Sequence, residues 1–256
     1  MWDWLLSPVD PQRAHEVSAA VAWHARSMVL GWGVLAPLSV LIARFFKILP
    51  GQNWPRELDS QVWWRCHFIG QSAVVVFSAT GLAVILLGHV STGRTAHATL
   101  GYVLVISLAA QVLLGLFRGG KGGPTDPAPD GSLHGAHYDM TPWRRAFETL
   151  HKALGYAALA LGAATILLGL WLANGPNWMW LVLTLWWVAL LLTALGLQRR
   201  GWAVDTYQAI WGDDPRHPGN LRPAPGWGMR RPGDARDQTK GHSDVRSDRG
   251  NRLRGH

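Results

Sequence analysis

The 256-residue chain has a single cysteine, Cys66, which excludes an intrachain disulfide and a thiolate metal cluster made by this chain alone. Cys66 is expected to act as a small apolar filler. The first twenty residues lack a basic segment and a long apolar segment, which argues against a cleaved signal peptide. Acidic residues are few, 16 against 24 Lys and Arg, and none is expected inside the apolar segments. Chemistry inside those segments must therefore come from other side chains.

Apolar residues gather in five blocks, at residues 21–45, 62–88, 97–117, 148–172 and 178–197. A hydrocarbon core of ~30 Å needs about 20 residues of helix to cross it. Open sheets and loops would leave backbone polar groups unpaired in lipid, so the blocks are predicted to be helices. The chain is thus expected to be an all-α integral membrane helical bundle with five transmembrane helices and a four-helix core. Pro37 should kink the first helix, and Thr141 before Pro142 is a helix start signal.

The segments around these helices define the predicted organisation. Residues 1–20 should form an N-terminal interfacial segment anchored by Trp2 and Trp4, and residues 21–172 the core. Residues 173–200 hold the fifth helix. Residues 119–140 are rich in Gly, Pro and Asp, which indicates a loop. Residues 201–256 form a basic tail that we expect to be disordered.

The net charge of +8 is unevenly distributed. We name side A the end where the first, third and fifth helices begin, and side B the opposite end. Side A carries three basic residues, Arg13, Arg26 and Arg94, whereas the short loops and helix ends of side B carry nine. This excess predicts that side B is cytoplasmic, with the N-terminus outside and the C-terminus inside. It favours a membrane protein over a nucleic-acid-binding one.

Four of the eleven histidines lie in apolar helices: His24, His67, His97 and His151. His24 and His97 lie near side A, where their helices begin, and His67 and His151 lie near side B. Each pair comes from helices that lie diagonally across a four-helix bundle. The depths therefore predict two facing imidazole pairs, one at each level.

Two nitrogens at one level are too few for zinc, which takes three or four protein ligands. Haem iron needs only one or two, because the porphyrin supplies four nitrogens. Glycines in register with the histidines, such as Gly155, Gly101 and Gly31, would leave room for a flat macrocycle. The alternative for these glycines is close helix packing. Haem carboxylates would need cations at the membrane surfaces, and Arg44 is the strongest candidate. Most of the basic residues there are also explained as ordinary flanks of membrane helices.

The remaining histidines carry less weight. His89 lies at the outer end of the second helix, and its pairing with His24 in place of His97 would break the diagonal pattern. His15, His134 and His137 are expected to be solvated.

The histidines stand in four motifs: "HARSMVLGWGVLAPLSVLIARFF", "WWRCHFIGQS", "HATLGYVLVISLAAQVLLGLFR" and "LHKALGYAALALGAATILLGL". Over about residues 20–172 the chain resembles the cytochrome b561 family, in particular the four-helix core of ferric-reductase-like and bacterial members. The resemblance implies two bis-histidine haem b groups, held by His24 with His97 outside and by His67 with His151 inside. It also implies a basic contact at Arg44.

What the resemblance implies for function is a diheme cytochrome of the bacterial inner membrane. Its donor and acceptor would be a quinol or a redox protein, and it would act in contact with lipid as a homodimer or a subunit of a redox complex. Three alternatives stay open. They are an oxidoreductase acting on ferric chelates or quinones, a proton-linked transporter with a histidine relay, and a membrane anchor for a soluble redox partner.

Overall fold

The computed structural model describes residues 2–90, 95–124 and 126–233. Within these residues the chain is helical and forms no strand, only two isolated bridges. Five helices are long and apolar enough to cross a membrane, as predicted. The first runs through α2 (Ala19–Met28), the π-helix η1 (Val29–Leu35) and α3 (Ala36–Phe45), and the others are α4 (Val62–Leu87), α5 (Ala96–Leu116), α6 (Pro142–Leu172) and α7 (Asn177–Arg199).

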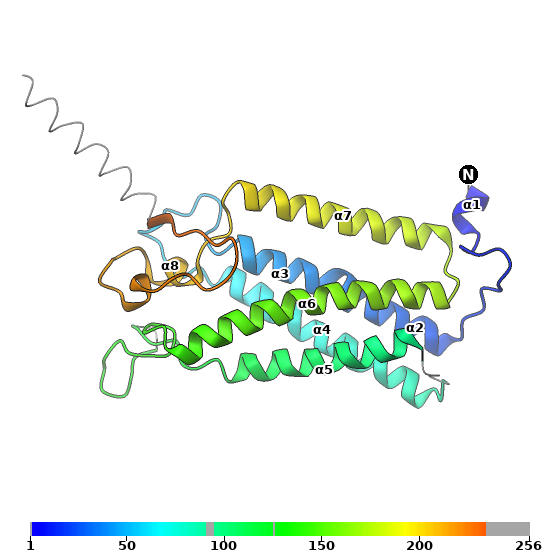
Figure 1. Cartoon of the computed structure of the whole chain (residues 1–256), viewed down its shortest axis with the longest axis horizontal. Coiled ribbons are helices and arrows are strands. Elements are labelled where there is room, and N and C mark those ends of the chain that lie inside the picture. The colour runs from blue at the N-terminus through cyan, green and yellow to red at the C-terminus, as the bar shows by residue number, and fades with distance from the viewer. Residues whose placement is uncertain (1, 91–94, 125, 234–256) are drawn as a thin grey trace, which may run out of the picture.

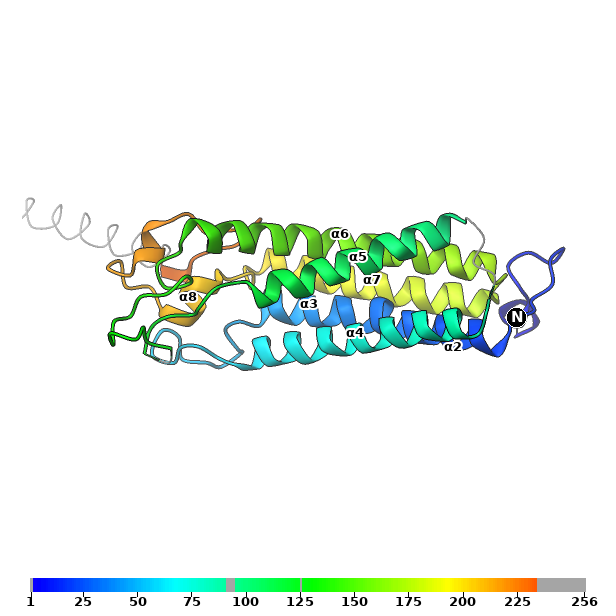
Figure 2. The same cartoon turned by 90° about the horizontal axis from the view of Figure 1, so that it is seen from below.

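The five helices lie side by side along the long axis of the molecule (Figures 1 and 2). The short helix α1 (Trp2–Leu6) and the N-terminus lie at side A, and α8 (Thr206–Trp211) lies at side B. In the bundle, α5 packs mainly on α6, while α4 packs on α2, η1 and α3. These two groups meet through η1 against α6, and α7 packs outside on α3. Many leucines and valines of α5 and α7 are exposed, as suits a surface that faces lipid.

Hydroxyl side chains fix where three of the helices start. Ser18, Thr95 and Thr141 each accept a hydrogen bond from the backbone N–H three residues later, at 3.2–3.3 Å. Such caps satisfy amides that have no partner inside the helix. The cap at Thr95 places His97 in the first turn of α5. The predicted start of α6 at Thr141 and Pro142 is confirmed.

The first span departs from regular α-helix just before Pro37, where seven residues form η1. A proline has no N–H, so the carbonyl of Gly33, four residues earlier, loses its usual helical partner. The indole N–H groups of Trp186 and Trp187 on α7 both donate to that oxygen, at 3.0 Å each. The irregularity predicted at Pro37 is therefore a π-helical stretch whose free carbonyl is bound by α7.

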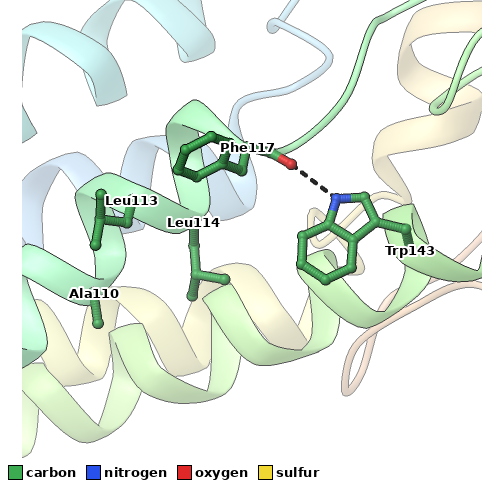
Figure 3. Close-up of a pocket in the computed structure, with 5 residues that line it drawn as sticks. All are labelled: Ala110, Leu113, Leu114, Phe117 and Trp143. Carbon is green, nitrogen blue, oxygen red and sulfur yellow. Dashed lines mark hydrogen bonds between the residues drawn. The ribbon is translucent and has the colours of Figure 1, made fainter.

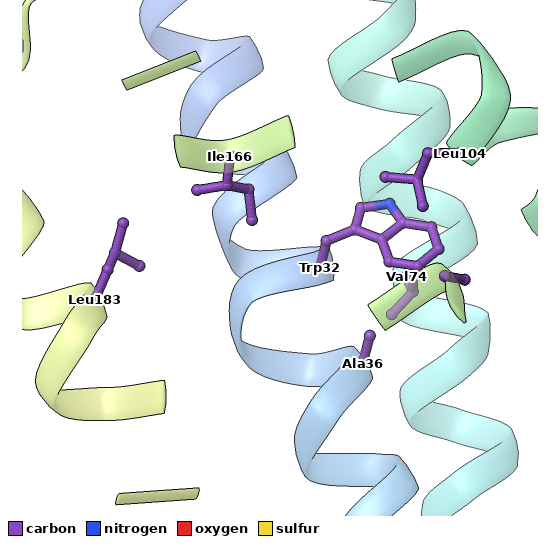
Figure 4. Close-up of a cluster of buried hydrophobic side chains, with 7 residues drawn as sticks. Trp32, Ala36, Val74, Leu104, Ile166 and Leu183 are labelled. Atoms are coloured by element: carbon purple, nitrogen blue, oxygen red, sulfur yellow. The ribbon is translucent and has the colours of Figure 1, made fainter. Parts of the chain in front are cut away.

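The centre of the bundle is an apolar cluster around Trp32 of η1 (Figure 4). Trp32 contacts Val74, Leu104 and Ile166 from three other helices and donates its indole N–H to Ser78 Oγ at 3.0 Å. Gly162 of α6 packs against it, since a Cβ there would lie 3.2 Å from Trp32 Cε3. The cluster lies between the two histidine levels and contains no charged residue.

Residues 201–233 correct the expectation that everything after residue 200 is disordered. They form α8 and the 3-10 helix η2 (Pro218–Leu221), and Tyr207 and Asp205 are almost fully buried. Asp205 pairs with Arg231 at 2.8 Å, and the backbones of Asp205 and Arg230 are hydrogen-bonded. This segment covers side B of the bundle. The rest of the predicted tail lies outside the described residues.

Candidate functional site: two histidine pairs

His24 of α2 and His97 of α5 lie together at side A, with their ring centroids 6.0 Å apart and their planes at 83°. His67 of α4 and His151 of α6 lie together at side B, 6.2 Å apart and at 80°. The structure thus brings together the histidines whose depths are equal in the sequence. Each pair joins a helix of the α2, α3 and α4 group to a helix of the α5 and α6 group.

The ring separations have a chemical meaning. An imidazole nitrogen lies about 2 Å from a bound first-row metal, so two imidazoles on opposite sides of one metal have centroids about 6 Å apart. Among the described residues, no group of three or more His, Cys, Asp or Glu side chains is placed to hold a metal ion. Each level therefore offers two facing imidazoles, and a metal ion held between them would need its other ligands from a cofactor.

At side A, both rings are oriented by main-chain carbonyls. Nδ1 of His24 lies 2.9 Å from Gly81 O, and Nδ1 of His97 lies 2.9 Å from Thr165 O. A carbonyl oxygen can only accept, so each Nδ1 carries a proton, and in a neutral ring the lone pair then lies on Nε2. A histidine that binds a metal through one nitrogen usually donates from the other in this way. The side-A rings are therefore in the tautomer that Nε2 ligation requires.

At side B, the corresponding nitrogens are buried without a hydrogen-bond partner, on both His67 and His151. The His67 ring also interacts with the main chain of Ser39. Gln111 of α5 donates its amide N–H to the backbone carbonyl of His151 at 2.9 Å, and its own Oε1 is also buried and unpartnered. The side-B pair has the same spacing as side A but lacks its carbonyl hydrogen bonds.

The glycines of α6 face side chains of this chain. A Cβ at Gly169 would lie 2.8 Å from His97 Cε1, and a Cβ at Gly155 would lie 3.2 Å from Gln111 Nε2. Gly155, predicted to face the cofactor, thus makes room for Gln111 beside His151. On α5, Gly101 has a nearest neighbour at 4.0 Å and Gly115 has none within 4 Å, so their faces are open. The glycines of α6 thus allow close packing of neighbouring side chains, whereas those of α5 have no close neighbour.

Basic side chains converge next to the side-B pair. Arg44 donates to Tyr156 Oη at 2.7 Å, to Gln198 Oε1 at 2.9 Å and to the carbonyl of Trp227 at 2.8 Å, and among the described residues it pairs with no carboxylate. Lys47 is 3% exposed and donates only to the carbonyls of Arg44 and Val204. Burial and the nearby Lys152 ammonium lower the pKa of Lys47 to about 7. Cations whose hydrogen-bond partners are neutral oxygens are suited to an anionic ligand.

The described part of side A has no such cluster. Arg26 is exposed, with its guanidinium 5.1 Å from the Trp23 ring centroid, and Arg13 donates to the last carbonyls of α6. Arg94, the third basic residue of side A, lies outside the described residues. His89 follows the end of α4 and is exposed, apart from both pairs.

Two residues at side B correct the sequence predictions. Glu148, in the second turn of α6, is 4% exposed, so one carboxylate does lie buried in a spanning helix. It binds Arg144 Nε at 3.1 Å and Lys152 Nζ at 2.9 Å. His137, expected to be solvated, is 1% exposed, and its Nε2 lies 3.6 Å from Glu148 Oε1. The i, i+4 spacing of Arg144, Glu148 and Lys152 is the one sequence signal that marks this cluster.

His137 is held by the segment that covers side B. Its Nδ1 accepts from Trp211 Nε1 at 3.2 Å, and its ring lies 5.6 Å from that of Tyr207. Burial is the main reason why the pKa of His137 falls to about 3, with Arg144 adding to the effect. The ring is therefore neutral at pH 7. His15 and His134 are exposed, as expected.

A shallow apolar groove lies between the end of α5 and the start of α6, near side B (Figure 3). It is lined by Ala110, Leu113, Leu114, Phe117 and Trp143, and Trp143 Nε1 donates to the Phe117 carbonyl at 2.8 Å. Its lining holds no titratable side chain. The groove is thus distinct from the histidine pairs.

Several known proteins are similar to this chain in sequence. The chain is 26% identical over 162 residues to a cytochrome b561 and DOMON domain-containing protein of Arabidopsis thaliana, which covers 60% of this chain and 33% of the relative. It is 27% identical over 150 residues to ferric-chelate reductase 1 of Bos taurus, covering 57% and 22%. A putative ferric-chelate reductase 1 of Xenopus laevis is 26% identical over 151 residues, covering 57% and 22%. No family model and no solved structure matches the chain.

The fold and the relatives together define a class. The chain is a multi-pass all-α membrane protein with distant relatives named for cytochrome b561 and ferric-chelate reductase, which supports a cytochrome b561-like protein. The chain spans a third or less of the length of these relatives.

Proposed function

We propose that this chain is a diheme b-type cytochrome that carries electrons across the membrane between a donor and an acceptor. The observation that carries the proposal is the pair of facing imidazoles at each end of the bundle, with ring separations of 6.0 and 6.2 Å. Both separations suit bis-histidine ligation of one iron. The relatives named for cytochrome b561 support haem b as the group.

Each of the two levels would hold one haem. His24 and His97 would hold one haem, His67 and His151 the other, and each haem would supply a one-electron couple when bound. The chain orients the four rings, excludes water with the apolar cluster around Trp32, and leaves open wall at Gly101 and Gly115. Because both axial positions at each level would be filled, no metal position stays open to a small substrate. This favours electron carriage over substrate binding at iron.

The cations at side B are suited to the haem carboxylates. Arg44 and Lys47 donate only to neutral oxygens, so an anionic group would gain charge-assisted hydrogen bonds there. Lys152 Nζ donates one hydrogen bond to Glu148 Oε2 and one to the carbonyl of Pro225. These three side chains are the proposed carboxylate partners on side B. Arg26 is the described candidate on side A.

The bias of basic residues toward side B supports an orientation with side B in the cytoplasm of a bacterial cell and the N-terminus outside. Donor and acceptor would then meet the chain at opposite faces of the inner membrane. A quinol or a redox protein is the proposed donor. The proposal includes assembly as a homodimer or within a redox complex.

A second candidate function is the reduction of ferric chelates at one face, favoured by the two relatives named as ferric-chelate reductases. The purified chain would then turn over a ferric chelate with no protein partner added. A proton-linked transporter is less well supported. The buried carboxylate it would need, Glu148, is already bound by two cations.

The first experiment is an absorption spectrum of the detergent-purified chain, oxidised and dithionite-reduced, together with a pyridine haemochrome assay. The expected result is two haem b per chain with low-spin reduced spectra. In His67→Ala and His24→Ala, one haem should be lost and the other retained. A chain free of haem after expression with ample haem supply would overturn the proposal.

A further inference from the structure

We propose that residues 225–230 anchor side B of the chain to anionic lipid headgroups. The inference goes beyond electron transfer and does not depend on whether haem is bound. Two independent observations support it: the position of the exposed Trp227 at the end of α7, and the exposed arginines around it. These arginines are separate from the cations proposed to bind haem carboxylates.

Helix α7 binds a segment with an exposed tryptophan at each of its ends. At side A, Asn177 in the first turn of α7 donates its side-chain amide to the carbonyl of Trp4 at 3.0 Å. At side B, Gln198 in the last turn donates to the carbonyl of Gly228 at 2.8 Å, next to Trp227. Trp4 and Trp227 are 59% and 64% exposed. One spanning helix therefore positions a tryptophan at both sides of the bundle.

The length of α7 matches the thickness of a membrane. Its 23 residues correspond to about 35 Å of helix at about 1.5 Å per residue, and a hydrocarbon core is ~30 Å thick. At side B, Arg44 in the last turn of α3 also donates to the carbonyl of Trp227, at 2.8 Å, so a second spanning helix fixes the same level. Tryptophan is enriched at both membrane–water interfaces, because its ring is apolar and its N–H is polar.

Charge distinguishes the segment at side B from α1 at side A. Arg199 and Arg200 at the end of α7 are exposed, and so is Arg230, whose Nε donates to the carbonyl of Gly201 just after that end. In the described part of the chain, none of these three arginines is in a salt bridge. Helix α1 carries Asp3 and no basic residue. Only the side-B tryptophan is thus surrounded by exposed cations.

These features together favour a lipid as the partner. Arginines at a membrane surface attract anionic headgroups, and phosphate oxygens accept strong hydrogen bonds from guanidinium groups. A soluble acidic protein would also meet the arginines, but it would not require a tryptophan at the level where two spanning helices end. The occupant is therefore an anionic phospholipid of the side-B leaflet, and the contact should depend on lipid charge.

The test is a spin label at Trp227→Cys, in a Cys66→Ser chain reconstituted into nanodiscs of phosphatidylcholine with or without phosphatidylglycerol. With phosphatidylglycerol, oxygen, which partitions into lipid, should reach the label better than a water-soluble nickel complex does. A label at Leu221→Cys is the control. Leu221 is exposed and belongs to η2, which packs on α8 beyond the ends of the spanning helices (Figure 1). The nickel complex should reach this second label better in both lipids.

The double variant Arg199→Gln with Arg200→Gln tests the charges. In it, the label at position 227 should enter the lipid no deeper with phosphatidylglycerol than without. Arg216→Gln is the matched control, because Arg216 is exposed but already paired with Asp214, so the dependence on lipid should stay. A label at 227 that remains in water in both lipids would overturn the anchor. Equal immersion in the two lipids with all arginines present would overturn the recognition of anionic headgroups.

A measurement on the unmodified chain keeps the test valid if a label disturbs the segment. Chymotrypsin cleaves after large apolar side chains. Cleavage after Trp227 should be several-fold slower in nanodiscs with phosphatidylglycerol than in phosphatidylcholine alone, whereas cleavage after the exposed Leu133 in the loop at residues 119–140 should be the same in both. Equal rates after Trp227 would contradict the proposal. Absence of haem would overturn the proposed function and leave this test unaffected.

Discussion

The histidine pairs at the two sides have nearly the same ring separations, 6.0 and 6.2 Å, and nearly the same angles, yet their surroundings differ. At side A, the rings are oriented by carbonyls of helices that pack directly on them. At side B, the surroundings are side chains on α6, the end of α3 and the covering segment 201–233. The same ligand geometry can thus arise from helix packing alone or with the help of loops and buried charge.

The largest difference between the sides should appear when the buried carboxylate of side B is removed. Glu148→Gln leaves Arg144 and Lys152 without their anion in a buried site, which costs about 3–5 kcal/mol. Thermal unfolding in detergent should shift strongly downward, and the side-B haem should be lost before the side-A haem. The control is Glu16→Gln on the exposed N-terminal segment. Equal loss of both haems would show that the levels are not independent.

The next effect is expected at side A, where Gly169 faces His97. In Gly169→Ala the new Cβ would lie 2.8 Å from His97 Cε1, and overpacking of this kind costs up to about 3 kcal/mol. The ring would move away from Thr165 O, so the side-A haem should be weakened. Haem content and difference spectra would measure the loss. Gly196→Ala on α7, where no atom lies within 4 Å, should behave as the wild type.

A pH effect is expected at side B. The pKa of His137 is about 3 in the folded chain, below the 6.5 expected when unfolded, because the ring is buried. The unfolded state binds the proton first as pH falls, so stability is lost from about pH 6.5 downward, by about 2 kcal/mol at pH 5. Protease cleavage within residues 201–233 should therefore increase between pH 7 and pH 5.

His137→Asn tests the cause, because it keeps an acceptor for Trp211 Nε1 and cannot be protonated in this range. The pH dependence of cleavage should flatten in this variant. Cleavage at the side-A segment 7–17 should be the same in both proteins at each pH. A dependence that persists in His137→Asn would assign the effect to another group.

The smallest effect is expected at the start of α5. Thr95→Ala removes the hydroxyl that caps Ala98 N, at a cost of about 1 kcal/mol. His97 lies in the first turn, so fraying there should broaden the spectrum of the side-A haem and leave side B unchanged. Thr99→Ala is the control, since Thr99 Oγ1 only donates back to its own helix. Identical spectra in the two variants would exclude a role for the cap.

Much of the fold could be predicted, because crossing lipid requires long apolar helices and these are visible as runs of residues. The five helices lie where the apolar blocks are, and Thr141 starts α6 as expected. Residues 201–233 were harder, since their Gly, Pro and Arg content is typical of disorder. They fold because Tyr207 and Trp211 find partners on the loop at residues 119–140, and because Asp205 pairs with Arg231 within the segment.

By itself, the sequence determined which histidines share a level, since helix rise per residue converts position in a span into depth. It also determined the excess of cations on side B. Only the tertiary structure decided the partners of each Nδ1, the burial of His137 and Glu148, and the isolation of Lys47 from solvent. These depend on atoms from other helices and loops that meet only after folding. Depth is a property of one helix, whereas a hydrogen bond between helices is a property of their packing.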